Sequence, residues 1–190
     1  MARGMKLTVG IKGLKQGTNI KDITVPDALR HRKRTGLEWF DDALGGDGFV
    51  PSSVMMLTGT PGAGKTTMLL QLADAITAAG HICLYNTGEE SLYQTKMVVD
   101  RLGLRHGFVV GQDTMVPDLL TDWAKATHGV VVFIGQVTKN GDFAGKQTIL
   151  HAVDVRGELY IDEDKRSETH GERIFEVTKN RFGCNGRSYI

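Results

Sequence analysis

The stretch SVMMLTGTPGAGKTTMLLQL, residues 53–72, decides the fold of this chain. Residues 53–58 are a short apolar run that predicts a strand, and residues 59–64 are rich in glycine. From residue 65 to residue 80 apolar residues recur at helical spacing, which predicts a helix. A strand, a glycine-rich loop and a helix in this order are typical of an α/β protein built on a parallel sheet.

The glycine-rich loop fits the pattern G-x-x-x-x-G-K-[ST] at residues 59–66. Its glycines let successive backbone N–H groups turn inward around a phosphate chain, and the start of the next helix adds the positive end of its dipole. We therefore expect bound ATP and Mg²⁺, with the Lys65 ammonium on the β- and γ-phosphates and the Thr66 hydroxyl on the metal. The expected nucleotide-binding residues are Gly59, Thr60, Pro61, Gly62, Ala63, Gly64, Lys65, Thr66 and Thr67.

The same alternation of strands and helices extends to both sides of the loop. Leu37, Phe40 and Leu44 recur at helical spacing before a Gly-Gly stop and predict a short amphipathic helix. We expect further helices at residues 91–102 and 117–127, and strands at residues 81–86, 108–111, 129–135, 151–162 and 173–178. This order predicts an α/β fold with a mostly parallel central sheet, flanking helices and a β-rich C-terminal part.

Composition is that of a folded globular chain: 190 residues, 41% hydrophobic and 24% charged, with a net charge of +1. No apolar stretch reaches the roughly 20 residues of a membrane helix, and residues 1–20 lack the features of a secretory signal, so we expect a cytoplasmic protein without a membrane partner. Cys83 and Cys184 have no CxxC spacing, which argues against a zinc site. A single disulfide between them stays an open alternative. The basic run at residues 30–34 has two interpretations: it contacts the phosphates of a nucleic acid, or it is a solvated segment.

Hydrolysis needs groups beyond the phosphate-binding loop, because a water molecule must be activated and the γ-phosphate sensed. Glu89 and Glu90 follow the strand expected at residues 81–86, and one of them is our candidate for the water-activating carboxylate. The alternative is that both lie in the first turn of the next helix, where negative charge is favourable. Gln136 follows the strand expected at residues 129–135 and is a candidate γ-phosphate sensor, or only a polar strand end.

Several segments together resemble the ATPase core of the RadA/Sms branch of the RecA family. They are TGLEWFDDALGG (35–46), GTPGAGKTT (59–67), LYNTGEES (84–91), VVVFIGQVTKNGDFAGKQTILHAVD (130–154) and VTKNRFG (177–183). The resemblance implies a RecA-like P-loop fold, a DNA-stimulated ATPase, a ring-shaped homo-oligomer such as a hexamer, and a role on single-stranded DNA in recombination and repair, with a recombinase or helicase as possible partner. It divides the chain into an N-terminal arm, residues 1–33, and the ATPase core, residues 34–190, without the family's zinc finger and protease-like domain.

Two further sets of residues take their roles from this resemblance. In the family, the lysine and arginine of KNRFG act on the nucleotide of a neighbouring subunit, which implies this role for Lys179 and Arg181; the alternative is a solvated basic strand end. Residues 137–153 resemble the DNA-facing loop of the family. They imply phosphate contacts for Lys139, Asn140 and Lys146, with Gly141 and Gly145 as hinges, or else an ordinary exposed loop.

The sequence departs from the family at the Walker B strand, a run of four apolar residues that ends in aspartate. No such run occurs between residues 101 and 136, and Leu120 is followed directly by Thr121 where the family has a longer segment. Three explanations stay open for this internal gap near residues 120–121: a flexible segment outside the printed sequence, a deletion, or a divergent protein in which Asp113 supplies the carboxylate.

Three functions follow from these observations. The first is a DNA-stimulated ATPase of the RecA/RadA type, and the second is a nucleotide-gated assembly or DNA-binding module with little or no hydrolysis, which the missing Walker B run favours. A clock-protein-like or helicase-like RecA relative shares the P-loop and the paired glutamates, but KNRFG favours RadA over it.

Overall fold

The structure is a computed structural model of the 190-residue chain, and it describes residues 18–87, 90–112, 117–135 and 153–190. The elements before the first sheet strand are short: η1 (Ile20–Asp22), α1 (Asp27–Arg30) and α2 (Glu38–Ala43). The remaining elements are β1 (Val54–Gly59), α3 (Lys65–Ala78), β2 (Leu84–Asn86), α4 (Leu92–Leu102), β3 (Val109–Gly111), α5 (Pro117–Thr127), β4 (Val131–Ile134), β5 (Val155–Ile161), β6 (Arg173–Asn180) and β7 (Arg187–Tyr189).

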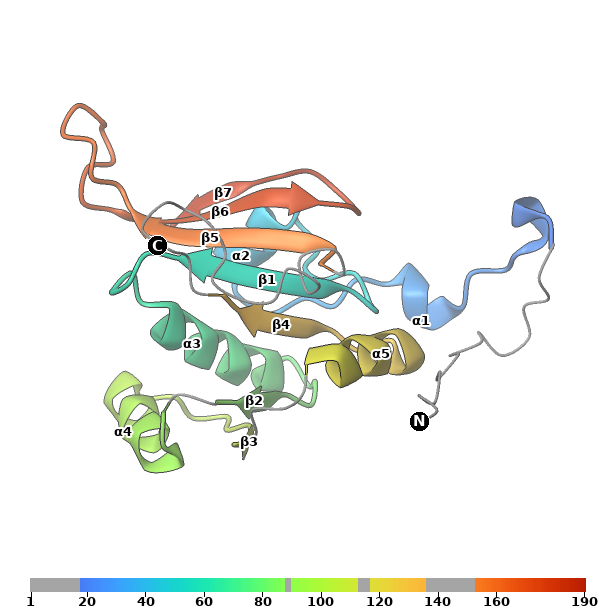
Figure 1. Cartoon of the computed structure of the whole chain (residues 1–190), viewed down its shortest axis with the longest axis horizontal. Helices are drawn as coiled ribbons and strands as arrows, with labels where there is room; N and C mark the ends of the chain where they lie inside the picture. Colours follow the sequence, from blue (N-terminus) through green and yellow to red (C-terminus); the bar gives the residue numbers. More distant parts are fainter. Residues whose placement is uncertain (1–17, 88–89, 113–116, 136–152) are drawn as a thin grey trace, which may run out of the picture.

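A five-stranded sheet with the order β4-β1-β5-β6-β7 is the centre of the molecule (Figure 1). β1 pairs with β4 and β5 in parallel, while β6 and β7 add antiparallel strands at one side. The sequence predicted the parallel sheet and the β-rich C-terminal part, and both are confirmed. It did not predict the three-residue β7, because so short a segment leaves no hydrophobic period to detect.

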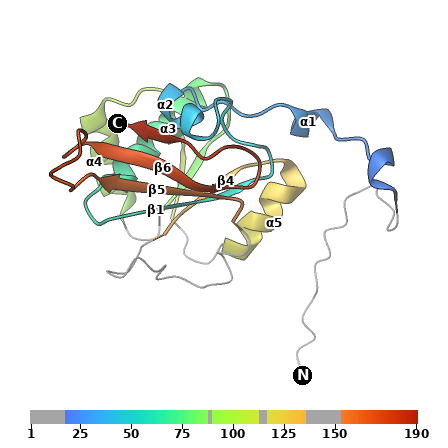
Figure 2. The same ribbon diagram turned by 90° about the horizontal axis from the view of Figure 1, so that it is seen from above.

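Two hydrophobic cores lie on opposite faces of this sheet. Helices α2, α3 and α4 are on one face, and α5 is on the other (Figure 2). The larger core joins residues of α2 and α3 to Leu57, Leu159 and Phe175, and Phe175 stacks on Phe40 with ring centroids 4.9 Å apart. The smaller core packs α5, through Ala124, against strand residues of β1 and β4. All six residues of β1 are buried, because both faces of this central strand are covered.

A second, two-stranded parallel sheet consists of β2 and β3. Helix α4 connects its strands and begins with a capping box in which Ser91 and Gln94 bond reciprocally. Gly103 ends the helix in the left-handed conformation. Asp74 of α3 fixes the loop before β3, since it accepts hydrogen bonds from the backbone N–H of His106 at 2.8 Å and of Gly107 at 3.1 Å.

The basic run at residues 30–34 has a third role that neither expectation included. The Arg32 guanidinium donates to the carbonyls of Phe182 at 2.8 Å and Leu44 at 3.3 Å, and the Lys33 backbone pairs with Phe49. This arginine therefore links α2 to the segment that follows β6.

Two further observations concern helix length and the cysteines. None of the helices in the described ranges is long and apolar enough to cross a membrane. Cys83 and Cys184 are both free thiols, and burial raises the pKa of Cys83.

Candidate nucleotide-binding site

The loop between β1 and α3 has the backbone geometry that a phosphate chain requires. Gly62 and Gly64 have φ of +81° and +94°, which residues with a side chain rarely tolerate. Gly64 is the N-cap of α3 and brings no side-chain cap, so the first N–H groups of the helix receive no side-chain bond from it. The Lys65 ammonium donates to the carbonyls of Gly59 at 2.8 Å and Thr60 at 2.9 Å, and thus lies across the loop.

Gly59 at the end of β1 is held by close contact with the neighbouring strand. A Cβ on Gly59 would lie 2.1 Å from the carbonyl oxygen of Leu159, so no larger residue fits without a shift of the backbone. The loop therefore starts from a fixed point of the sheet.

Glu90 faces Thr66 across the site. The Thr66 hydroxyl donates to Glu90 Oε1 at 3.4 Å, and the Glu90 N–H donates to the Thr87 hydroxyl at 3.2 Å. The second carboxylate oxygen, Oε2, is buried and has no hydrogen-bond partner. A hydroxyl next to a carboxylate that has one unpaired oxygen offers the hard oxygen donors that Mg²⁺ prefers, so the residues present fit this metal.

Arg173 is a further residue of this site, and the sequence analysis did not single it out. Its guanidinium lies beside Gly64, with Cζ 3.4 Å from the position that a Cβ of Gly64 would take. It begins β6 and alternates with Phe175 and Val177, which are buried on the α3 face of the sheet. This alternation is the signal that places Arg173 toward the start of α3.

Lys179 and Arg181 lie at the opposite end of the sheet from the P-loop. The Lys179 ammonium donates to the carbonyl of Val153 at 2.8 Å, and Arg181 Nη1 donates to Asp154 Oδ1 at 3.1 Å. Asp154 is itself only 8% exposed and accepts from the Val54 N–H, at the start of β1. The two cations are therefore fixed beside the first residue of β1, whereas the P-loop follows its last.

The other candidate residues fall on parts of the chain that the structure does not describe. These residues are Glu89, Asp113, Gln136, Lys139, Asn140, Gly141, Gly145 and Lys146. Their roles stay predictions.

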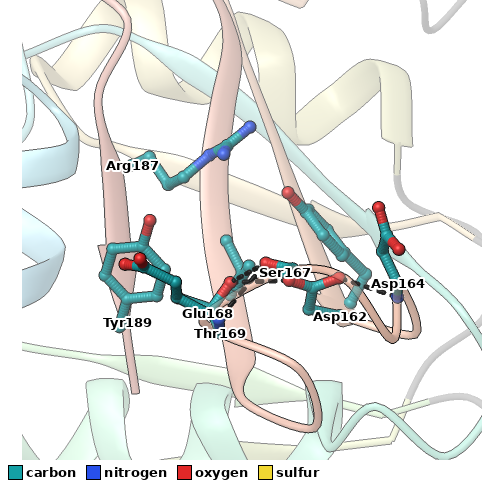
Figure 3. Close-up of a pocket in the computed structure, with 9 residues that line it drawn as sticks. Asp162, Asp164, Ser167, Glu168, Thr169, Arg187 and Tyr189 are labelled. Carbon is teal, nitrogen blue, oxygen red and sulfur yellow. Dashed lines mark hydrogen bonds between the residues drawn. The ribbon is translucent and has the colours of Figure 1, made fainter.

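A separate cavity of about 420 Å³ lies between the β5–β6 hairpin and β7 (Figure 3). The hairpin closes on Asp162, which accepts from the Thr169 hydroxyl at 2.6 Å and from the Asp164 N–H at 3.0 Å. Hydrogen bonds from Ser167, then Thr169 and the Asp164 N–H, lower the pKa of Asp162 to about 2. The residues that line this cavity include none of residues 59–67 and neither Glu90 nor Arg173, so the cavity is separate from the candidate nucleotide site.

Known proteins are similar to this chain over the region that contains the loop. The family model described as "ATPase: KaiC" matches residues 33–109, which include the P-loop and Glu90. The chain is 32% identical to the DNA repair protein RadA of Mycobacterium tuberculosis, over 85% of this chain and 42% of that protein. It is equally similar to RadA of Bacillus subtilis, over 84% of this chain and 43% of that protein. The chain thus spans less than half the length of these relatives.

The relatives also contain internal residues that this chain lacks. The alignment with the M. tuberculosis protein spans 207 residues, whereas 85% of this 190-residue chain is about 160 residues, so about 45 aligned positions have no residue here. A difference of similar size, about 40 positions, separates the 201-residue alignment with the B. subtilis protein from the 84% of this chain that it covers.

The fold is also known from solved structures. One structure, described as an ATPase domain, superposes with a TM-score of 0.67 at 13% identity, over 86% of this chain and 88% of that one. The helices and the sheet of this chain thus have an arrangement already seen in an ATPase domain. These matches show that the chain carries a RecA-like ATPase region of the RadA type.

Proposed function

We propose that this chain binds ATP at residues 59–67 and hydrolyses it as the motor core of a protein that acts on single-stranded DNA in recombination and repair. The observation that carries the proposal is the contact of the P-loop with Glu90, whose Oε1 accepts from the Thr66 hydroxyl and whose buried Oε2 has no hydrogen-bond partner. The similarity to proteins named for DNA repair supports the biological setting.

Mg²⁺ is the cofactor that we propose beside the nucleotide, with Thr66 and Glu90 as the described residues that hold it. The metal would neutralise charge that develops on the phosphates. If Glu90 is committed to the metal, the neighbouring Glu89 is the carboxylate that remains to accept a proton from the attacking water. Gln136 would sense the γ-phosphate. Lys65 would move from its present carbonyl partners to the phosphate chain, because an anion is the stronger acceptor for an ammonium.

Lys179 and Arg181 are proposed to act on the nucleotide of a neighbouring subunit. β1 separates them from the loop of their own subunit, and its five residue steps at about 3.3 Å each give about 17 Å. That distance is longer than an arginine side chain. A second copy in a ring, of which a hexamer is one form, would bring these cations to the phosphates, where an arginine supplied across an interface stabilises the transferred charge.

We propose that Lys139, Asn140 and Lys146 contact the backbone of single-stranded DNA. Such contacts are insensitive to base sequence and weaken with salt. A recombinase or a helicase is the proposed protein partner, and the cytoplasm the proposed location.

The experiment measures phosphate release with and without single-stranded DNA. Lys65→Ala should abolish hydrolysis, and Lys179→Ala should retain nucleotide binding but lower turnover; Lys165→Ala, an exposed lysine of the β5–β6 hairpin, is the matched control. Mixing Lys65→Ala with Lys179→Ala subunits should restore part of the activity, because some interfaces then combine an intact loop with an intact lysine. If Lys179→Ala equals the parent in rate, the role across an interface is wrong.

A nucleotide-gated assembly module with little or no hydrolysis is the second candidate. Two observations favour it: no Walker B run occurs between residues 101 and 136, and about 45 aligned positions of a RadA relative have no residue in this chain. We place the deletion near residues 120–121, within α5, which is continuous across this point. Phosphate release at equal nucleotide occupancy separates the two candidates. The intact mass of the purified chain, compared with 20.8 kDa, tests whether the deletion is real.

A further inference from the structure

Three buried side-chain polar atoms in the described part of the chain have no hydrogen-bond partner: Ser53 Oγ, Glu90 Oε2 and Arg173 Nε. Two of these atoms belong to side chains at the P-loop: Glu90 contacts Thr66, and Arg173 lies beside Gly64. Buried polar atoms are nearly always paired, so an unpaired one needs an explanation. The metal that we propose explains the unpaired oxygen of Glu90. The unpaired Nε of Arg173 has no explanation so far.

Arg173 is held in an electrostatically unfavourable place. Its guanidinium lies against Gly64, the N-cap of α3, where the helix dipole is positive. Lys65, whose side chain carries a positively charged ammonium group, follows Gly64 directly in the sequence. The ion pairs found among the described residues do not include Arg173. The Arg173 guanidinium therefore meets two other positive charges, the Lys65 ammonium and the positive end of the α3 dipole. These charges repel one another unless an anion binds among them.

The strand fixes this arrangement. Arg173 is paired with Ile161 in the β5–β6 ladder, and its carbonyl accepts from the Ile190 N–H at 2.9 Å. Phe175, two residues along the same face, is fully buried. The backbone that carries Arg173 is thus held from both sides, at the end of the strand nearest the loop.

We propose that Arg173 is a second cation of the nucleotide site, which donates to the phosphate chain of a nucleotide bound to its own subunit. This inference rests on the proposed nucleotide binding and goes beyond it. A planar guanidinium donates several N–H groups in a fixed fork that fits phosphate oxygens. Arg173 would act within its own subunit, whereas Lys179 and Arg181 would act across an interface, so the phosphate chain would meet cations from two subunits.

The test compares Arg173→Gln, Arg173→Lys and the control Arg166→Gln, which removes an exposed arginine of the adjoining hairpin. ADP binding is measured with EDTA present, so that metal contributes nothing. Loss of a hydrogen bond to a charged group should weaken ADP binding at least about tenfold in Arg173→Gln. Arg173→Lys should fall between, since it keeps the charge and loses the fork, and Arg166→Gln should bind as the parent does.

Pyrophosphate, used as a competitor, shows which part of the nucleotide is contacted. Arg173→Gln should weaken pyrophosphate binding by the same factor as ADP binding. If ADP binding falls while pyrophosphate binding stays as in the parent, the contact is with the nucleoside and the proposal is wrong. ADP affinity within twofold of the parent also overturns it.

Thermal unfolding separates a ligand contact from a structural role. Without nucleotide, Arg173→Gln should have a Tm equal to or above that of the parent, because an unpaired buried donor and a repulsive charge are removed. Saturating ADP should then raise its Tm less than that of the parent. A lower Tm without nucleotide, together with unchanged ADP affinity, would show a purely structural residue. If the parent itself binds no ADP, the proposed function fails; if it binds and only Lys65→Ala loses binding, the inference on Arg173 fails alone.

Discussion

Replacement of Asp154 by alanine removes a buried carboxylate that joins three segments of the chain. Asp154 Oδ2 accepts from the Val54 N–H at 3.1 Å, and Oδ1 accepts from Arg181 Nη1 at 3.1 Å. Its own backbone N–H donates to the Val54 carbonyl at 2.8 Å, and its carbonyl accepts from the Arg181 N–H at 3.1 Å. The carboxylate therefore fixes the beginning of β1 and the KNRFG segment to the same point.

The two lost side-chain bonds differ in what they contribute. Val54 is fully buried, so its unpaired N–H should cost about 1–3 kcal/mol. The Arg181 side chain is 51% exposed, so water screens its ion pair, which should contribute no more than about 1 kcal/mol. We expect Asp154→Ala to lower the free energy of unfolding by about 1–4 kcal/mol. Asp154→Asn, which keeps an oxygen for Val54, should lower it by about 1 kcal/mol.

Urea unfolding of the nucleotide-free protein measures this loss. The matched control is Asp100→Ala, which removes an aspartate from the exposed i,i+4 pair with Lys96 on α4 and should cost about 0.3–0.5 kcal/mol. If Asp154→Ala costs no more than Asp100→Ala, the buried bond to Val54 does not stabilise the fold and the reasoning is refuted.

Three further predictions test the loop, the core and the hairpin. Gly59→Ala should destabilise by about 1–3 kcal/mol, seen in urea unfolding, because its Cβ would clash with the Leu159 carbonyl; Gly80→Ala, where nothing lies within 4 Å, separates that clash from strain at positive φ. Phe175→Ala should cost about 3–5 kcal/mol in the same assay, since the ring is fully buried; a loss below about 1 kcal/mol contradicts this. The lowered pKa of Asp162 stabilises the folded state above pH about 4, and this contribution is lost as pH falls toward 2; Asp162→Asn should remove that part of the acid dependence of Tm, and an unchanged profile contradicts it.

The long elements could be predicted from the sequence because each carries its own period. The apolar run before Gly59 and the helical spacing after Lys65 predicted β1 and α3 to within two residues. The strand expected at residues 81–86 is shorter in the structure, where it spans Leu84–Asn86. Ile82 is apolar but 95% exposed, so its side chain does not mark a residue of the strand. Apolar type alone does not say which residues a neighbouring strand covers.

The site was predictable where a motif fixes spacing and unpredictable where folding brings segments together. The pattern at residues 59–66 identifies the loop, and paired glutamates after a strand point to Glu90. Arg173 is more than 100 residues from Gly64 in sequence, and only the antiparallel return of β6 beside β5 brings it to the loop. The link between Asp154 and Arg181 has the same origin.

The separate two-stranded sheet has a consequence for how the molecule opens. β2 and β3 pair only with each other among the described strands, and α3 contacts both β2 and α4. Two-stranded sheets are marginal in water, so the amides of this unit should exchange with solvent faster than those of β1 and β5. Because Thr87 and Glu90 follow β2 closely, a nucleotide with its metal should slow that exchange.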